Sequence, residues 1–339
     1  SEFLQKDYEQ TIITIIGYLV NVMFFYSVYT IIFVCDGIKD RILCLGMVIF
    51  ASLFLRNREL NANFKTICLT VLFVLNARNK NPKVLLWITY IVGWFEILLS
   101  FILSRLEIIP AYVYSGTRHG FGSVYPTDLA CHFLVLVITI CILKKGKLNV
   151  FDYGWYLLIS AVNYVYMQAK TGVLLVLLVL VGNAIYQYLI PYMKVPEKLV
   201  TVYKAAMVII YPFFAAVTII WTKLFVDTPD SFLHKFNSIR LRFVYGNDAM
   251  NTYGISWWGV YFKEVGNGGV PGKRVDYYFV DISYVRILLQ QGIIFFALVL
   301  FIYTLTQFKF IKNGMLYFAY LFAVFALDCA IEHHIAHIT

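Results

Sequence analysis

Charged residues are scarce in this sequence. Asp, Glu, Lys and Arg make up 14% of its 339 residues, whereas a soluble domain carries about 25%. The roughly ten-residue alternating segments of a transmembrane β-barrel are also missing, as are nucleotide-binding glycine loops, HExxH zinc helices and GxSxG nucleophile turns. The composition therefore excludes an ordinary soluble domain, and the missing motifs disfavour ATP-driven, nucleotide-binding and hydrolase-fold proteins.

Cysteine is present, but never in the CxxC spacing that marks metal or redox sites. Each cysteine falls inside an apolar stretch, where Cys behaves as a small hydrophobic residue. We therefore expect neither a disulfide framework nor a cysteine metal site. The cysteines are Cys35, Cys44, Cys68, Cys131, Cys141 and Cys329.

Long hydrophobic runs are what the sequence has in abundance, since 61% of its residues are hydrophobic. A run of about 20 apolar residues forms a helix that crosses a bilayer. The recurring runs predict an all-α, polytopic integral membrane protein, in which residues 1–339 form a single transmembrane domain with about ten transmembrane helices. Two short runs, 42–55 and 64–76, are left open as tilted or re-entrant segments. The predicted segments are 11–35, 42–55, 64–76, 84–103, 127–143, 152–168, 171–190, 199–226, 281–303 and 314–337.

Basic residues in the short loops predict the orientation of these helices. Lys and Arg are concentrated in one alternating set of loops, which should face the cytoplasm. The stretch 118–133, the turn at 167–172 and a large loop at 227–280 then lie on the extracytoplasmic face. The net charge of +9 fits this topology and anionic lipid or lipid-phosphate ligands, and it does not indicate a nucleic-acid partner.

The large extracytoplasmic loop begins with helical periodicity, which predicts a short amphipathic helix over 232–244. On a helical wheel Arg240 falls inside the apolar arc, whereas Lys235 and Arg242 fall on the polar side. An arginine on a packing face needs a nearby anion. Two interpretations stay open: a structural pair with an acid such as Asp281, or a bound substrate phosphate, which guanidinium matches bidentately.

The stretch RHGFGSVYPTDLACHF (118–133) sets polar residues against the start of an apolar helix. Arg118 is either a snorkelling interfacial arginine or a ligand-binding cation. Asp128 lies in the first helical turn, where a carboxylate complements the helix dipole, so it is either a capping acid or a site residue. His132 lies one turn further along the same face and is either a buried, hydrogen-bonded histidine or a substrate contact.

Other candidate site residues lie further along the chain. Lys170, in the turn between two apolar helices, shares the predicted outer face with Arg118. Asp281 begins the ninth predicted segment, with Tyr284 about one turn away on the same face. Asp281 is either a helix cap or the group that accepts a proton from a sugar hydroxyl. His334, near the end of the last segment, is a further candidate for that second role.

The last segment ends in LDCAIEHHIAH, where two acids and two histidines stand at helical spacing. Asp328 and Glu332 are four residues apart, and so are His333 and His337. A zinc site from these residues is conceivable, but one helix offers too few ligands and no standard zinc motif occurs. We therefore predict no metal site and no cofactor.

Four short motifs follow one another in an order that one family shares. An arginine, a Gly-Phe pair and a helix-opening proline occupy 118–126, and QAKTG forms a polar turn at 168–172. SIRL (238–241) places an arginine in the large loop, and VDISYVRILLQQGII (280–294) opens the next helix. In this order and spacing the chain resembles Wzy-type polysaccharide polymerases. It departs from them at Thr127-Asp128, where the family has Asn, and at Ala169-Lys170, where the family has Ser-Arg.

The resemblance implies an enzyme of the O-antigen ligase and polymerase superfamily, with a GT-C-like glycosyltransferase fold. Such an enzyme joins undecaprenyl-diphosphate-linked oligosaccharide repeats on the outer face of the bacterial plasma membrane, as in capsule or exopolysaccharide synthesis. The implied transfer is inverting and metal-independent, and the implied partners are the lipid-linked donor and acceptor, membrane lipids, a chain-length regulator and a flippase. The residues implied to be catalytic are Arg118, Arg240 and Asp281, and those implied to bind substrate are Asp128, His132, Lys170, Tyr284 and His334.

The residues agree with this chemistry, but other functions stay open. Cleavage of a sugar–diphosphate bond develops negative charge that fixed cations can stabilise, and the acceptor hydroxyl needs a proton acceptor. A ligase for finished glycan would use the same groups. A flippase for lipid-linked sugars would more often show two related halves and broken helices at the midplane. A non-enzymatic membrane scaffold is the least specific alternative.

Overall fold

The computed structural model describes residues 80–114, 117–228, 232–266 and 277–334, together with isolated positions before residue 80. The chain divides into two compact units, residues 1–111 and residues 112–337, and each is described by itself. Apart from those isolated positions, the segments predicted before residue 80 lie outside the described residues.

The first unit is described through one long helix, α4 (Pro82–Arg105). The helix begins where Oδ1 of Asn81 accepts a hydrogen bond from the backbone N–H of Lys83 at 3.0 Å. Pro82 occupies the first turn, where a missing N–H breaks no helical hydrogen bond. Most side chains of this apolar helix are exposed within the chain, and only Ser104 is buried, which suits a helix that faces lipid.

Within its described residues the second unit is mainly helical, with one short antiparallel hairpin and an isolated antiparallel bridge between Val265 and Tyr278. Its first half holds β1 (Val113–Tyr114), β2 (Arg118–His119), α5 (Pro126–Leu143), α6 (Val150–Val162), the π-helical turn η2 (Asn163–Met167), α7 (Lys170–Ala184), and the turns η3 (Ile185–Leu189) and η4 (Ile190–Tyr192). Its second half holds α8 (Glu197–Leu224), the 3-10 turn η5 (Phe232–Phe236), α9 (Asn237–Tyr253), α10 (Ser283–Gln290), α11 (Gly292–Lys312) and α12 (Leu316–Cys329).

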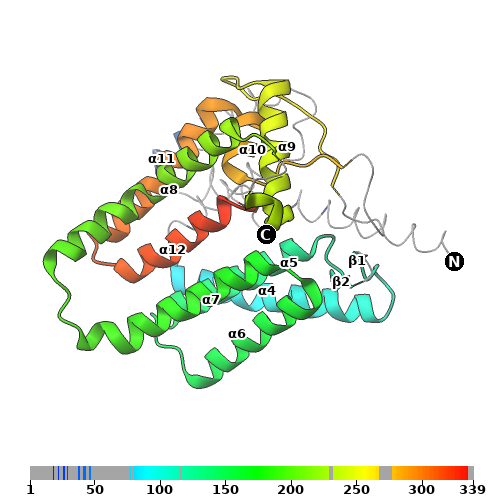
Figure 1. Ribbon diagram of the computed structural model, residues 1–339. Coiled ribbons are helices and arrows are strands. Elements are labelled where there is room, and N and C mark those ends of the chain that lie inside the picture. Colours follow the sequence, from blue (N-terminus) through cyan, green and yellow to red (C-terminus); the bar gives the residue numbers. More distant parts are fainter. Residues whose placement is uncertain are drawn as a thin grey trace. The chain divides into compact units, whose positions relative to one another are not determined.

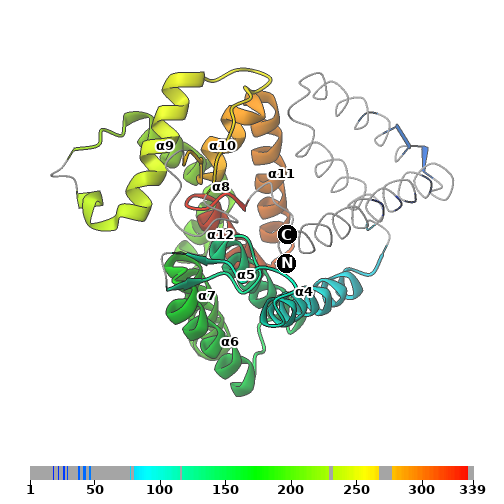
Figure 2. The same ribbon diagram turned by 90° about the vertical axis from the view of Figure 1, so that its right-hand side faces the viewer.

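Helix α12 lies at the centre of this unit, where it contacts α7, α8 and α11. Helices α5 and α6 pack against α7 on one side of it, and α9 and α10 pack against α8 on the other, as the two ribbon views show (Figure 1; Figure 2). Residues 330–334 follow α12. They therefore lie between the two groups of helices.

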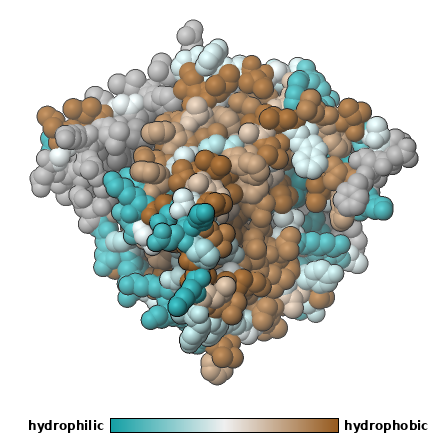
Figure 3. All heavy atoms as spheres, turned by 60° about the vertical axis from the view of Figure 1, so that its left-hand side comes forward, coloured by the Kyte–Doolittle hydropathy of each residue, from teal (hydrophilic) through white to brown (hydrophobic). Residues whose placement is uncertain are grey.

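Helices α4, α5, α8 and α11, together with α7 extended to Tyr192, are long and apolar enough to cross a membrane, judged by length and composition. Many of their large apolar side chains are exposed, and hydrophobic residues cover much of the face shown in Figure 3. Exposed apolar surface on this scale is typical of side chains that face lipid. The prediction of an all-α class with membrane-spanning helices is thus confirmed. The total of about ten spans stays a prediction.

The predicted break at 167–172, within the long apolar run from Trp155 to Ile190, is confirmed. Helix α6 continues through η2 and ends at Met167, Gln168 has a left-handed backbone with φ 51°, and α7 begins at Lys170. At its other end α6 begins with a capping box, in which the side chains of Asn149 and Asp152 each accept a backbone N–H of the other residue. Such reciprocal caps satisfy N–H groups that a helix start leaves unpaired.

The prediction of one continuous helix over 281–303 is wrong. Helix α10 ends at Gln290 and α11 begins at Gly292, whose φ of 82° lies in the left-handed region. A Cβ at this position would overlap the backbone of Gly259 and Trp257. The break therefore comes from a distant loop that crosses close to the helix, and the local apolar pattern contains no signal for it.

Gly292→Ala is expected to destabilise the protein by roughly 2–4 kcal/mol, because left-handed strain and overpacking act together. Gly314→Ala is the matched control, since Gly314 has a φ of 70° but open space around its Cβ position. Its cost should be the backbone strain alone, about 1 kcal/mol. Thermal unfolding in detergent compares the two variants, and equal losses would argue against the close approach of the 257–259 loop.

Polar contacts identify one end of the second unit. The backbone N–H of Leu148 donates to Oε1 of Gln187 at 3.1 Å, and the hydroxyl of Tyr317 donates to the side chain of Asn183. The loop between α5 and α6, the later part of α7 and the beginning of α12 therefore share this end.

The opposite end gathers several of the stretches that were predicted to face outward. Nε of Arg118 donates to the carbonyl oxygen of Met167 at 2.8 Å, so the hairpin lies against the turn that precedes α7. The backbone N–H of Ser283 donates to the carbonyl oxygen of Glu332 at 3.2 Å, so α10 begins beside the residues that follow α12. Side chains from α5, α10 and the C-terminal residues can therefore meet here.

Candidate functional site

A group of charged and imidazole side chains lies at the end of the second unit where α5 begins and α12 ends. Burial of charged groups among apolar helices is costly unless they are paired, and perturbed titratable groups concentrate at functional sites. We call this group the polar cluster. Its members are Asp128 of α5, Arg242 of α9, Asp281 before α10, Asp328 of α12, and Glu332, His333 and His334 after α12.

Arg242 is the buried cation of the polar cluster. Its side chain is 8% exposed, Nη2 lies 2.7 Å from Oε1 of Glu332, and Nε lies 3.6 Å from Oδ2 of Asp281. Burial by itself would lower the pKa of Arg242, but the negative charges of Glu332 and Asp281 outweigh it and raise that pKa. Arg242 is therefore a permanent positive charge held between two carboxylates.

The prediction that Arg240 lies on the packing face and Arg242 on the polar face is wrong. Arg242 is buried, whereas the Arg240 side chain is 18% exposed and its Nη1 lies 2.5 Å from Oδ2 of Asp227. The wheel assumed one α-helix over 232–244. Residues 232–236 instead form the 3-10 turn η5, and Phe236 has a non-helical backbone before α9 begins. The apolar arc of the wheel therefore does not continue in phase into α9.

The packing face of α9 consists of small residues around one arginine. Gly246 is tightly packed, since a Cβ there would approach the side chain of Thr222 in α8. Small residues let helices approach closely. They add little to the apolar pattern from which a helical wheel identifies the packing face. The buried residues of α9 are Arg242, Gly246, Ala249 and Met250, at i, i+4, i+7 and i+8.

Asp281 stands between this arginine and a histidine. Its Oδ1 lies 3.8 Å from Nδ1 of His333, and its side chain is 21% exposed. Burial raises the pKa of Asp281 to about 6, although Arg242 opposes the shift. A carboxylate with a raised pKa accepts a proton more readily than an ordinary aspartate.

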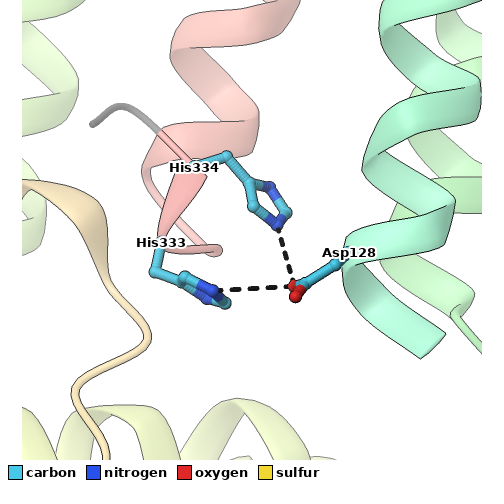
Figure 4. Close-up of side chains that lie close together, drawn as sticks. All are labelled: Asp128, His333 and His334. Carbon is cyan, nitrogen blue, oxygen red and sulfur yellow. Dashed lines mark ion pairs between the residues drawn. The ribbon is translucent and has the colours of Figure 1, made fainter. Parts of the chain in front are cut away.

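Asp128 points toward two histidines in the residues that follow α12, as Figure 4 shows. Its Oδ1 lies 3.6 Å from Nε2 of His333 and 3.8 Å from Nε2 of His334, and neither distance is a hydrogen bond. Nδ1 of His334 lies 2.9 Å from Oδ2 of Asp328, which is a hydrogen bond. Asp128 therefore belongs to the polar cluster in addition to lying in the first turn of α5.

His334 is almost completely buried, with 3% of its surface exposed. Burial favours the neutral imidazole, but the carboxyl groups of Asp128 and Asp328 favour the charged form more strongly, so the pKa of His334 is raised. The imidazole thus has an acid near each of its nitrogens, Asp328 near Nδ1 and Asp128 near Nε2.

The predicted outer cations lie in different local settings. Arg118 is partly buried and bonds to the carbonyl of Met167, whereas Lys170 is exposed at the first turn of α7. The hairpin and the turn before α7 are therefore neighbours, as their shared predicted face requires. Arg240 donates hydrogen bonds to Oδ1 of Asn237 in addition to its pair with Asp227.

Two predicted substrate contacts lie in packed surroundings. Tyr284 is fully buried, and its hydroxyl donates to the carbonyl oxygen of Ala326 at 3.1 Å. This contact joins α10 to α12 and leaves no surface of Tyr284 for a ligand, so its assignment as a substrate contact is not supported. His132 is partly buried on α5, and its role stays a prediction.

The sequence reasoning missed Arg242 and underestimated the end of the last segment. Glu332 and His333 were considered only as zinc ligands on one helix, and His337 lies outside the described residues. The signal that could have found them is the presence of several ionisable residues within an otherwise apolar segment, which marks function in membrane proteins.

Comparison of the chain with protein-family models, with curated proteins and with solved structures finds no match. A functional assignment therefore depends on the chemistry of the chain's own residues.

Proposed function

We propose that this protein is a polysaccharide polymerase of the bacterial plasma membrane. It joins polyprenyl-diphosphate-linked oligosaccharide repeats on the outer face, and it transfers the growing chain to a hydroxyl of the next lipid-linked repeat. Support comes from the apolar helices, which offer a surface for polyprenyl chains, and from the order of the four motifs between residues 118 and 294.

The observation that carries the proposal is the setting of Asp281. This carboxylate lies between a buried arginine and a histidine, retains partial exposure, and has a pKa raised to about 6. A general base works best when its pKa is near the working pH. A fixed neighbouring cation such as Arg242 also keeps the carboxylate oriented for proton transfer.

The proposed reaction is a single displacement at the anomeric carbon of the donor. Asp281 accepts the proton of the acceptor hydroxyl while the hydroxyl oxygen forms a bond to that carbon. The bond between the anomeric carbon and the diphosphate oxygen breaks, and polyprenyl diphosphate leaves with the electron pair. Displacement from the opposite face inverts the configuration of the sugar.

Fixed cations stabilise the departing diphosphate in this scheme. Arg118, Lys170 and Arg240 are the proposed cations, because the motifs that resemble the polymerase family carry them. Arg240 is paired with Asp227, so the diphosphate competes with that carboxylate for the guanidinium. Donor and acceptor lipids are the proposed substrates, and a flippase and a chain-length regulator are the proposed partners.

Turnover of a defined lipid-linked repeat by the purified full-length chain tests the proposal. A ladder of product lengths is the expected result. A single discrete transfer would indicate a ligase instead, and the absence of a new glycosidic bond would leave a transporter or a scaffold.

Arg240→Ala is expected to lower polymer formation by about 10²–10³-fold, the usual effect of losing one charge-stabilising donor, while the protein is still produced. Lys235→Ala is the matched control, because Lys235 is an exposed cation in the adjacent turn. The measurement is the length distribution of polymer in cells that carry each variant. Normal chain lengths with Arg240→Ala would remove Arg240 from the site.

A further inference from the structure

We infer that Asp128, His333 and His334 form a binding site for a divalent transition-metal ion, with Zn²⁺ as the ion that suits these ligands best. The inference stands apart from the proposed function, because it concerns the ligand geometry of this chain and not the reaction. It also reverses our expectation from the sequence, which assigned no metal.

The distances between the three candidate ligand atoms suit one metal ion. Zn²⁺ binds imidazole nitrogen and carboxylate oxygen at about 2.0–2.2 Å, so the ligand atoms of a tetrahedral site lie about 3.4 Å apart. Oδ1 of Asp128 lies 3.6 Å from Nε2 of His333 and 3.8 Å from Nε2 of His334, and one ligand atom from each of the three residues lies within 4.8 Å of the others.

Two of the atoms that face the site are buried without hydrogen bonds of their own. Oδ1 of Asp128 and Nε2 of His334 are both inaccessible to solvent and make no hydrogen bond, and His334 is 97% buried, with 3% of its surface exposed. Buried polar atoms are normally satisfied. Both imidazoles point at the same carboxylate in Figure 4, and an ion between the three residues would satisfy these atoms together.

A neighbouring acid orients His334 as acids do in known metal sites, and a second acid lies near His333. Nδ1 of His334 bonds to Asp328 at 2.9 Å, which holds a proton on Nδ1 and turns Nε2 toward Asp128. The ion would replace the proton that the neighbouring acids favour on Nε2. Oδ1 of Asp281 lies on the Nδ1 side of His333, at 3.8 Å. A carboxylate behind each metal-binding histidine is the usual arrangement of an outer ligand shell.

A second possible set, Cys131, Asp328 and His334, fits less well. The 2.9 Å separation of His334 and Asp328 is that of a hydrogen bond, and it is too short for two ligands of one tetrahedral ion. Asp328 therefore orients His334 and does not compete for the ion. Two histidines and one carboxylate leave a fourth position for water, as in zinc sites with three protein ligands.

The sequence could not assemble this site from the last apolar segment alone. The two histidines come from the residues after α12, but the carboxylate comes from the first turn of α5, about 200 residues earlier in the chain. Adjacent histidines also differ from the i, i+4 spacing of helical zinc motifs.

The test measures metal in the purified full-length chain, carried on an affinity tag without histidine. Metal content is determined by inductively coupled plasma mass spectrometry after dialysis, after chelator treatment, and after Zn²⁺ is returned. We expect about one zinc per chain, and about tenfold to hundredfold weaker zinc binding for Asp328→Asn, which alters only the outer shell. Asp128→Asn and His334→Gln should lose the ion, whereas His119→Gln, which removes a histidine elsewhere, should keep it.

Replacement by Co²⁺ gives a readout that needs no variant. Co²⁺ held by nitrogen and oxygen ligands in a four-coordinate site has intense visible absorption, which wild-type protein should show and which Zn²⁺ should displace. Wild type without bound zinc and without this spectrum would overturn the inference. Equal zinc content in Asp128→Asn, His334→Gln and wild type would overturn it too. Because no lipid-linked sugar is present, the result does not depend on whether polymerisation is observed.

Discussion

Arg242→Ala is expected to destabilise the protein by about 3–5 kcal/mol. The substitution removes one partner of a buried charge network and leaves the other charges uncompensated, which is the costly way to break such a network. Arg242 has 8% of its side chain exposed, and its Nη2 lies 2.7 Å from Glu332. Its loss therefore removes the positive charge that Glu332 and Asp281 share. Equilibrium unfolding in mixed micelles measures the free energy change.

Arg240→Ala is the matched comparison for stability, because the same residue type is removed two positions away on the same helix. The pair of Arg240 with Asp227 is more exposed, with side-chain exposures of 18% and 37%, so its loss should change stability by no more than about 1 kcal/mol. Arg242→Lys keeps the charge but not the guanidinium geometry. Its loss of stability should therefore lie between those of Arg240→Ala and Arg242→Ala. Equal destabilisation by Arg240→Ala and Arg242→Ala would contradict the assignment of Arg242 as the buried cation.

Asp281→Asn is expected to reduce the rate of glycosidic bond formation by about 10²–10⁴-fold, the usual contribution of a general base. The amide has nearly the shape of the carboxylate but cannot accept the proton of the acceptor hydroxyl. The initial rate with a defined lipid-linked repeat measures the effect.

Glu197→Gln is a suitable control for this substitution, since Glu197 is an exposed acid in the first turn of α8. Its rate should match that of wild type. Size-exclusion profiles must agree among the three proteins, because Asp281 also contacts Arg242. A rate for Asp281→Asn within twofold of wild type would exclude Asp281 as the base.

Local patterns predicted the helix class and several boundaries correctly. Apolar runs of bilayer length predicted α4, α5, α7 and α8, and Pro126 marked the start of α5 because proline suits the first helical turn. The polar turn before Lys170 separated two helices as expected. Each of these features depends on residues that are close together in the sequence.

Features that depend on distant contacts could not be predicted in the same way. The break at Gly292 arises where the 257–259 loop approaches the helix, and nothing in the apolar run around Gly292 signals that approach. The choice between Arg240 and Arg242 failed because η5 ends before α9 and shifts the phase of the wheel.

The candidate site shows the same division. Asp281 and Asp128 could be selected as acids beside apolar helices, but their partners could not. Arg242, Glu332 and His333 reach them only because α9, α10 and the residues after α12 pack at one end of the second unit. A helical wheel describes one helix, whereas this cluster is built from four segments of the chain.

The most direct test of the central claim follows the lipid product of the proposed reaction. Wild-type protein and Asp281→Asn are incubated with one defined lipid-linked repeat, and both new glycosidic bonds and free polyprenyl diphosphate are counted over time. The account predicts one polyprenyl diphosphate released for each bond formed by wild type, and neither product above background with Asp281→Asn. Wild-type protein that forms no bond, or bond formation that persists unchanged in Asp281→Asn, would contradict it.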